Sequence, residues 1–239
     1  MLPVECPSLP VELAEYLAEQ RRREAPWNSL YRPRKAAAIK QVLRTAFHEK
    51  CGYCEQIEAQ TVDHFIPQAG NIDARWDWDN LVLACTVCQS YKLAQQPYDE
   101  DGNRMVNPRI DEPMDCLFFD LDTGSVVAQV TSTQTEARGT ITIHILGLDR
   151  RSRLQDERRR KVWDILTHAL TVVSAQSPQD EDAAWRTLVD HLRVTAPYLG
   201  IIRQLLLTEN RYTPIFAALR SKRPGFDTLI SEWCSPRPS

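Results

Sequence analysis

CGYC (residues 51–54) and CTVC (residues 85–88) are two Cys-x-x-Cys turns, and the segment between them decides the fold. A structural zinc ion takes four ligands in a tetrahedron, and each such turn offers two thiolates to one ion. The two turns therefore predict one zinc site that closes a loop between them, with the ligands Cys51, Cys54, Cys85 and Cys88. Four cysteines alone favour a structural zinc ribbon without chemistry, so only the content of the loop can indicate a reaction centre.

The bulk composition is that of a globular protein. The chain has 239 residues, of which 43% are hydrophobic, enough for a real core and for one or two domains. No basic, apolar leader begins the sequence, and no run approaches the roughly 18 to 20 apolar residues of a membrane span, so we expect a cytoplasmic protein without a membrane partner. In a reducing compartment the other three cysteines are thiols rather than disulfides, and we assign no role to Cys6, Cys116 and Cys234.

Charge is nearly balanced overall, with a formal net charge of -3, but it is segregated along the chain. Residues 21–44 hold eight basic residues against one acid, and residues 150–161 hold seven against two, whereas residues 99–122 hold eight acids against two arginines. Such basic runs bind phosphates in some proteins and are solvated helix faces in more of them. Charge therefore permits a nucleic-acid partner without indicating one.

Hydrophobic periodicity predicts a mixed α+β chain in its first half. We expect helices over residues 9–23 and 34–50, separated by a break at Pro26, Trp27 and Pro33, with the second helix ending before Gly52. TVDHFIP (61–67) is predicted to be a strand that stops at Pro67. Residues 80–95 begin like a strand and become helical at the second cysteine pair.

The second half is predicted to be mostly helical. CLFFDL (116–121) and VVAQVT (126–131) predict a hairpin with a turn at 122–124, and residues 140–148 suit either a strand or the opening of a helix. From residue 149 onward apolar stripes indicate helices, interrupted by a polar connector at 174–182. We therefore expect three segments: 1–110 with the zinc ribbon at about 45–95, a small strand-containing segment at 111–146, and a helical region at 147–239.

The loop between the cysteine pairs carries candidate catalytic groups. Asp63 offers the hard oxygen that magnesium or manganese prefers, and His64 titrates near neutrality, which suits a general base. Neighbours on a strand point to opposite faces, so both reach one phosphate only if the strand ends there, as Pro67 allows. Asn80 can brace the returning loop with its amide, and Gln89 and Lys92 lie on the first turn of a helix, a place that suits phosphate or metal.

These motifs resemble, in order and spacing, those of HNH endonucleases with a four-cysteine zinc site. The shared motifs are CGYC, VDHFIPQ, WDNLVL and CTVCQSYK. The resemblance implies a zinc-stabilised beta-beta-alpha-metal core with Asp63 as metal ligand, His64 as the base that activates water and Asn80 as brace. Gln89 stands where the family has Asn or His as second metal ligand. Its amide is one methylene longer, so Asp77 or Asp79 is an alternative ligand.

A weaker likeness extends along the chain and is similar to the HNH subunit of Septu anti-phage systems and related retron-associated nucleases. The region of Trp27, then MVNPRIDEP (105–113), FFDLDTGSVV (118–127) and residues 137–159 carry it. This resemblance implies an ATPase partner of the ABC or SMC type, docked on the C-terminal helices. The sequence leaves open whether the substrate is double-stranded DNA, single-stranded DNA or RNA.

Together these patterns predict a metal-dependent endonuclease that hydrolyses phosphodiester bonds of DNA, with structural zinc and a catalytic magnesium or manganese ion. Two alternatives involve no chemistry. One is a zinc ribbon that binds nucleic acid or protein and cuts nothing, and the other is an adaptor whose helical half holds an ATPase. Gln89 favours the first alternative, because a degraded site loses its metal ligand.

Overall fold

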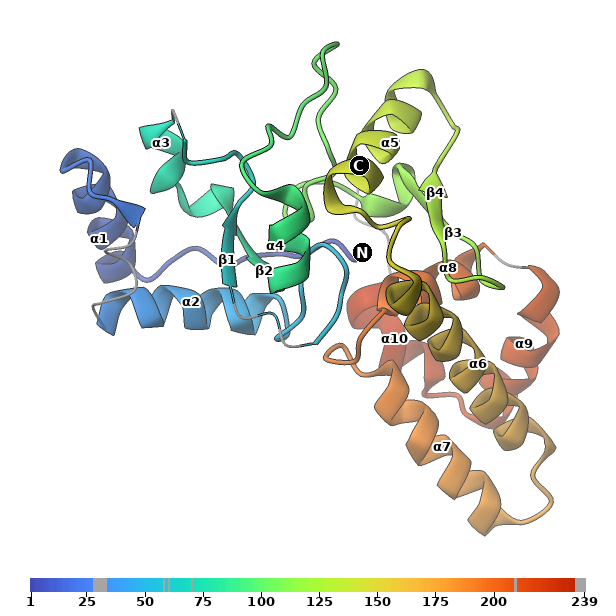
Figure 1. Cartoon of the computed structure of the whole chain (residues 1–239). Coiled ribbons are helices and arrows are strands. Elements are labelled where there is room, and N and C mark those ends of the chain that lie inside the picture. The colour runs from blue at the N-terminus through green and yellow to red at the C-terminus, as the bar shows by residue number, and fades with distance from the viewer. Residues whose placement is uncertain (28–33, 58, 60, 70, 209, 235–239) are drawn as a thin grey trace.

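The computed structural model describes residues 1–27, 34–57, 59, 61–69, 71–208 and 210–234, and it has the predicted α+β class (Figure 1). Two small antiparallel sheets of two strands each lie among helices in the described part of the chain. Helices α1 and α2 lie at one end of the molecule, and helices α6 to α10 form the other end (Figure 1). No described helix is long and apolar enough to cross a membrane.

The first sheet is a hairpin that carries the predicted catalytic strand. Strand β1 (Thr61–His64) pairs with β2 (Leu81–Ala84), so that Asp63 lies opposite Val82 and His64 opposite Leu81. Strand β1 is shorter than the predicted 61–67, although a further hydrogen bond from Phe65 N to Asn80 O prolongs the pairing by one residue. The connection contains two short helical segments, α3 (Ile72–Arg75) and the 3-10 turn η2 (Trp78–Asn80).

Helices α2 (Arg34–Ala46) and α4 (Thr86–Lys92) pack against this hairpin, and α1 (Val11–Arg22) packs on α2 and α3. Helix α2 ends four residues before the predicted Lys50, because His48 and Glu49 adopt positive φ angles of 51° and 61° that no helix accommodates. The break at Pro26 and Trp27 is present between α1 and α2, while Pro33 lies outside the described residues.

The middle of the chain contains the predicted hairpin and a helix at the stretch where the sequence had left strand and helix open. Strands β3 (Leu117–Phe119) and β4 (Val126–Ala128) follow the 3-10 turn η3 (Pro113–Asp115) and pair around Gly124, whose φ of 73° the turn requires. Residues 140–146 are helical, within α5 (Thr133–Leu146), and residues 147–148 form a turn. A capping box at Ser132 starts this helix, and Gly147 ends it in the left-handed conformation.

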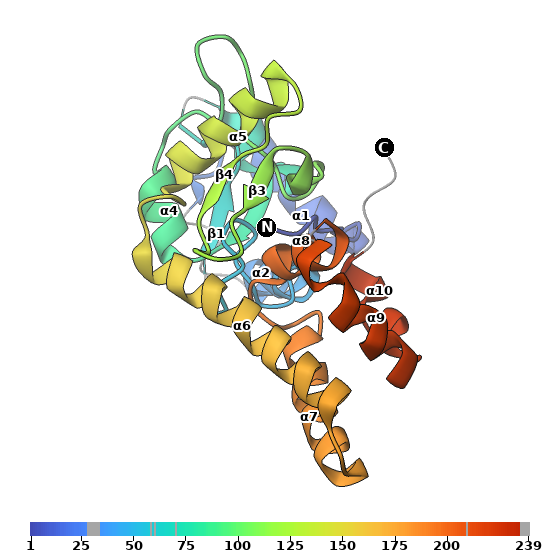
Figure 2. The same cartoon turned by 90° about the vertical axis from the view of Figure 1, so that its right-hand side faces the viewer.

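The C-terminal region is helical, as expected. Its long helices α6 and α7 contact each other along their length and project away from the hairpin (Figure 2). The predicted connector at 174–182 is wrong in extent, because only residues 175–177 separate the two helices: Ser177 caps α7, and Pro178 fits its first turn. The elements are α6 (Ser152–Ser174), α7 (Pro178–Leu192), α8 (Leu199–Leu207), η4 (Asn210–Tyr212), α9 (Thr213–Lys222) and α10 (Phe226–Cys234).

One hydrophobic core connects the three predicted segments. Buried side chains of α2, β2, β3, α6 and α8 belong to a single cluster, represented by Leu43, Leu83, Phe119, Ile165 and Ile202. The boundaries near residues 110 and 146 stay a prediction. Because the core is shared, the hairpin and the helical region pack against the same buried side chains.

Candidate functional site

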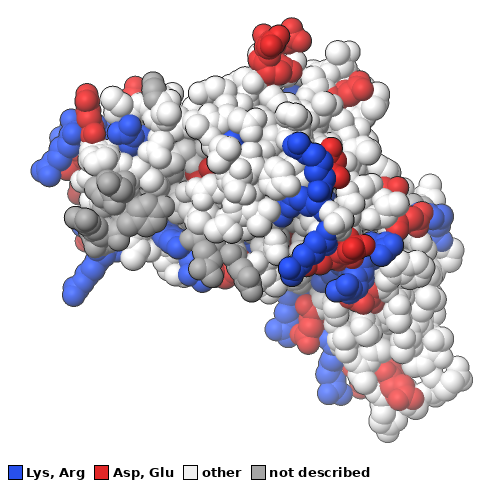
Figure 3. All heavy atoms as spheres, in the orientation of Figure 1, with Lys and Arg blue, Asp and Glu red and all other residues white. Residues whose placement is uncertain are grey.

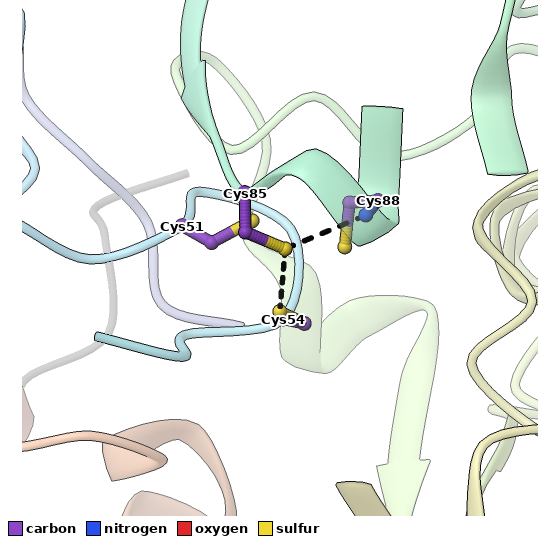
Figure 4. Close-up of side chains that lie close together, drawn as sticks. All are labelled: Cys51, Cys54, Cys85 and Cys88. Carbon is purple, nitrogen blue, oxygen red and sulfur yellow. Dashed lines mark hydrogen bonds between the residues drawn. The ribbon is translucent and has the colours of Figure 1, made fainter. Parts of the chain in front are cut away.

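The four cysteines of the two turns converge, as Figure 4 shows. Cys51 and Cys54 come from the loop after α2, and Cys85 and Cys88 come from the start of α4. All four sulfurs are buried and lie within 4.8 Å of one another. Tetrahedral coordination at a zinc–sulfur distance of about 2.3 Å separates the sulfurs by about 3.8 Å, and those of Cys54 and Cys85 are 3.7 Å apart. The cluster thus fits a zinc ion.

Local packing explains why the first turn has its shape. Gly52 donates a backbone hydrogen bond of 2.8 Å to Leu83 O, which fastens the turn to β2. A Cβ at this position would lie 2.5 Å from the ring of Phe47 and 2.9 Å from Val82, so no other residue fits without displacement. At the second turn, Cys85 caps α4, and its sulfur accepts a hydrogen bond from Cys88 N. Hydrogen bonds from the neighbouring thiols lower the pKa of Cys85 well below its ordinary value, whereas burial and the same hydrogen bonds raise the pKa of Cys51 and Cys88.

Asp63 is held by two residues beside the cysteine cluster. Tyr53, inside the first Cys-x-x-Cys turn, donates a 2.6 Å hydrogen bond to its Oδ2, and Lys92 Nζ on α4 lies 3.2 Å from the same oxygen. Burial, together with the Asp63 charge, raises the pKa of Tyr53, which keeps its hydroxyl a donor. Asp63 is only 5% exposed. Within the described residues no hydrogen bond reaches Oδ1, the oxygen through which a metal ion could bind.

His64 projects from the opposite face of β1, as alternation along a strand predicts. Its Nε2 lies 3.0 Å from the carbonyl oxygen of Arg75. A carbonyl oxygen only accepts, so Nε2 carries the proton and Nδ1 has the lone pair that a general base needs. Burial lowers the pKa of His64 below its ordinary value of 6.5, which keeps the imidazole neutral at pH 7.

Trp27 covers the imidazole. Its ring centroid is 4.2 Å from that of His64 in an edge-on arrangement, and Trp76 packs on Trp27 at 5.1 Å. His64 is 6% exposed as a result, which the sequence did not indicate. The sequence does not indicate that Trp27 or Trp76 lies beside His64. Trp27 stands 37 positions before His64, and Trp76 stands 12 positions after it.

Asn80 joins the two ends of the β1–β2 connection. Its Oδ1 accepts from Ile66 N at 2.7 Å, and its Nδ2 donates to Ile66 O at 2.9 Å and to Ala74 O at 2.8 Å. With these three hydrogen bonds Asn80 braces the loop, as predicted from its amide. The bond to Ala74 O fixes the backbone next to Arg75, whose carbonyl oxygen contacts His64. The role of Asn80 in catalysis stays a prediction.

The structure does not join the other predicted metal ligands to Asp63. Gln89 is half-buried on α4, and no hydrogen bond links its side chain to Asp63 among the described residues. Asp77 caps η2 by accepting from Asp79 N, and Asp79 pairs with Arg109 at 2.9 Å. The only close charged partner of Asp63 in the described part of the chain is therefore Lys92, which the sequence marked for phosphate or metal.

Several residues of the two basic runs form ion pairs with acids in the structure. On α6, Arg153 pairs with Glu157 and Arg159 with Asp156, and on the face shown in Figure 3 basic and acidic side chains lie side by side over this helix. Arg21, in the first run, pairs with Asp73. Exposed ion pairs of this kind leave less free positive charge than the sequence suggests.

Comparison with known proteins agrees with this site. Residues 49–93, which hold all four cysteines together with Asp63, His64, Asn80 and Gln89, match the family model described as HNH endonuclease. The chain is also 30% identical over 162 residues to the Septu protein PtuB of Bacillus mycoides (strain KBAB4), covering 55% of this chain and 53% of that protein. The match thus spans about half the length of this curated relative. No solved structure matches the chain significantly. The predicted resemblance to HNH endonucleases and to Septu proteins is confirmed.

Proposed function

We propose that the chain is a metal-dependent HNH endonuclease that hydrolyses phosphodiester bonds of DNA in the cytoplasm, as the nuclease of a Septu-type anti-phage complex with an ATPase of the ABC or SMC type. The observation that supports this most is the tautomer of His64. Its Nε2–H is engaged by Arg75 O, so the lone pair of Nδ1 is available within the segment that matches the nuclease family.

In this proposal His64 acts as general base. Nδ1 takes a proton from the water that attacks phosphorus, while the hydrogen bond from Nε2–H to Arg75 O holds the ring and stabilises the imidazolium that forms. A positioned base of this kind contributes about 100- to 10,000-fold to the rate. The low pKa of His64 ensures that the basic form predominates at neutral pH.

Asp63, through Oδ1, is the proposed ligand of a magnesium or manganese ion. Such ions are commonly held by one or two carboxylates together with water and substrate phosphate, so a single protein carboxylate is compatible with the site. When bound, the ion supplies neutralisation of the charge that develops on the phosphate. Tyr53 and Lys92 orient the carboxylate by occupying Oδ2, and Gln89 is a second proposed ligand.

Trp27 restrains the site in this proposal. A water molecule and a phosphate can reach Nδ1 only if the indole moves away from the imidazole, because His64 is nearly inaccessible beneath it. A nuclease in its host must be held inactive until needed. We assign the release of Trp27 to the ATPase complex and to DNA binding, with the C-terminal helices as the docking region.

A catalytically silent zinc ribbon is the second candidate function. The Asp63–Lys92 ion pair favours it, because the lysine ammonium already neutralises the carboxylate that would otherwise bind a metal ion. In this case the segment binds nucleic acid or protein and cuts nothing, and a buried His64 is packing alone.

Plasmid nicking separates the two candidates. Purified protein is incubated with supercoiled DNA and with manganese or magnesium, alone and together with the ATPase partner, and parallel samples receive a chelator or the His64→Ala variant. Nicking that requires the divalent ion and His64 supports the nuclease. Intact plasmid in every sample, including those with the ATPase, supports the silent ribbon.

A further inference from the structure

Arg151, the first residue ahead of α6, contacts the cysteine cluster. Its Nη1 lies 3.1 Å from the sulfur of Cys88, and its Nη2 lies 3.8 Å from the sulfur of Cys54. One guanidinium therefore spans both Cys-x-x-Cys pairs, since Cys54 belongs to the first and Cys88 to the second. The same side chain also lies 6.0 Å from the centroid of Tyr91, on the helix that carries Cys88.

Its neighbours in the basic run behave differently. Arg153 is 87% exposed as a side chain and pairs with Glu157 on its own helix. Arg150 pairs with Asp149 and donates to His144 O. Of the three arginines at the start of this run, Arg151 is thus the one directed at the sulfurs, whereas Arg150 and Arg153 form exposed ion pairs.

The contact between Arg151 and the sulfurs compensates the negative charge of a zinc–thiolate cluster. A zinc ion bound by four thiolates leaves two excess negative charges, and the cluster here is buried. Buried charge is costly unless a partner of opposite sign and hydrogen bonds compensate it. A planar guanidinium is suited to this task, because it stays charged and its fork can donate to two acceptors at once. Arg151 meets both needs.

A second set of contacts ties the first turn to the same helical region. Glu55, which follows Cys54 and is buried, accepts hydrogen bonds of 3.1 Å and 3.0 Å from Gly200 N on α8. Arg158, two turns after Arg151 on α6, is also buried, with its guanidinium 5.1 Å from the ring of Phe119. The loop that carries Cys54 is therefore fastened to α8 through Glu55, in addition to the contact that Arg151 makes with the sulfurs.

We propose that Arg151 hydrogen-bonds to the zinc-bound thiolates of Cys54 and Cys88, and that this contact makes the zinc cluster the anchor on which α6 docks. Zinc then does more than fold the segment around the cysteines: its occupancy holds the helical region against that segment. The proposal rests on zinc in the cysteine cluster and is independent of whether the chain cuts DNA.

Metal affinity and a spectroscopic signature test the contact. Purified Arg151→Met and the matched control Arg153→Met are compared with the wild-type chain by zinc competition against a chelating dye. Loss of a partner that holds a metal ligand typically weakens metal binding about 10- to 100-fold, and we expect this for Arg151→Met only. In cobalt-substituted protein, sulfur-to-metal charge-transfer bands should shift to lower energy, because thiolates that lose a donor become more electron-rich.

Hydrogen exchange tests the anchoring. With zinc still bound, Arg151→Met should show increased amide exchange at the start of α6, whereas the control Arg153→Met should exchange like the wild-type chain. Equal zinc affinity and an unchanged cobalt spectrum in Arg151→Met would overturn the proposal. If that variant does not fold, Arg151→Lys replaces it, with a smaller loss of affinity expected, and wild-type affinity and spectrum in this variant would also overturn it.

Discussion

The hydroxyl of Tyr53 donates a 2.6 Å hydrogen bond to the carboxylate of Asp63, so a residue of the zinc turn holds the proposed ligand of the catalytic metal. Tyr53 lies between Cys51 and Cys54 in the chain, and its position therefore depends on the cysteine cluster. In the proposed mechanism this contact couples the structural and the catalytic metal.

Tyr53→Phe is the sharpest test of that coupling. Removing one hydroxyl should leave the fold and the zinc content intact, while Asp63 loses a donor that orients it. We expect the manganese concentration for half-maximal nicking to rise about 10- to 100-fold. Tyr198→Phe, which removes a hydroxyl bonded to Glu157 instead, serves as control and should leave the manganese dependence unchanged. An unaltered titration in Tyr53→Phe would show that Asp63 is positioned without it.

Cys85→Ala should abolish zinc binding and the fold together. Zinc stabilises small zinc-dependent domains by an apparent free energy of about 10 to 16 kcal/mol at pH 7, more than most proteins have in reserve. Circular dichroism and metal analysis measure both losses in one sample. Cys234→Ala, a buried cysteine outside the cluster, is the control and should keep its zinc. A folded, zinc-free Cys85→Ala protein would show that the cluster contributes little to stability.

His64→Ala should remain folded and loaded with zinc but lose nicking activity by about 100- to 10,000-fold. The lost hydrogen bond to Arg75 O costs about 1 to 3 kcal/mol, which thermal denaturation can measure. His168→Ala is the control, because that histidine lies on α6 and should affect neither quantity much. Activity of His64→Ala equal to the wild type is incompatible with a general-base role.

The pH dependence follows from the direction of the His64 pKa. A general base works when unprotonated, so activity should rise with pH through the pKa of His64 and then level off. Because burial lowers this pKa, the half-maximal point should lie below 6.5, the ordinary value. Nicking rates between pH 4.5 and 8, at saturating manganese, measure it. A rise centred above 6.5 would indicate a different base or an exposed imidazole.

Trp27→Leu should raise basal nicking, because the smaller side chain uncovers His64. Substitution of a buried tryptophan also lowers the free energy of unfolding, by about 3 to 5 kcal/mol when the replacement is alanine and by less for leucine. Trp233→Leu is a matched control, since Trp233 is equally buried but donates to Leu192 O in the helical region. Increased nicking in both variants would trace the effect to destabilisation rather than to exposure of the imidazole.

Local patterns predicted most of the fold. Helices α2, α6 and α7, the β3–β4 hairpin, the strand character of β1 and β2 and the cysteine cluster follow from apolar periodicity and cysteine spacing, whereas the resemblance to HNH endonucleases implied the beta-beta-alpha arrangement. Helix α5 was left undecided, because its Thr140 to Ile145 stretch alternates like a strand while its boundaries also suit a helix. Packing decides in favour of a helix there: a Cβ on Gly139 would lie 2.2 Å from Cys116 O, so the helix approaches β3 and β4 closely. Such a contact between distant segments has no local signature.

The same limit applies to the site. Alternation along β1 predicted correctly that Asp63 and His64 lie on opposite faces. It did not predict that Lys92 is buried against Asp63, or that Trp27 covers His64, because both contacts join elements that are far apart in the chain. Tyr53 had a signal in the sequence, as an aromatic residue with a hydroxyl inside the cysteine turn, and its partner became evident only in three dimensions.

The shared core has a consequence for engineering. Leu43 and Leu83 beside the hairpin belong to the same buried cluster as Ile165 and Ile202 of the distant helices. If residues 49–93 were moved alone into another scaffold, the apolar side chains that pack against these neighbours would be exposed to water and would favour aggregation. A design that reuses this segment must therefore replace those apolar side chains with polar ones or include the helices that cover them.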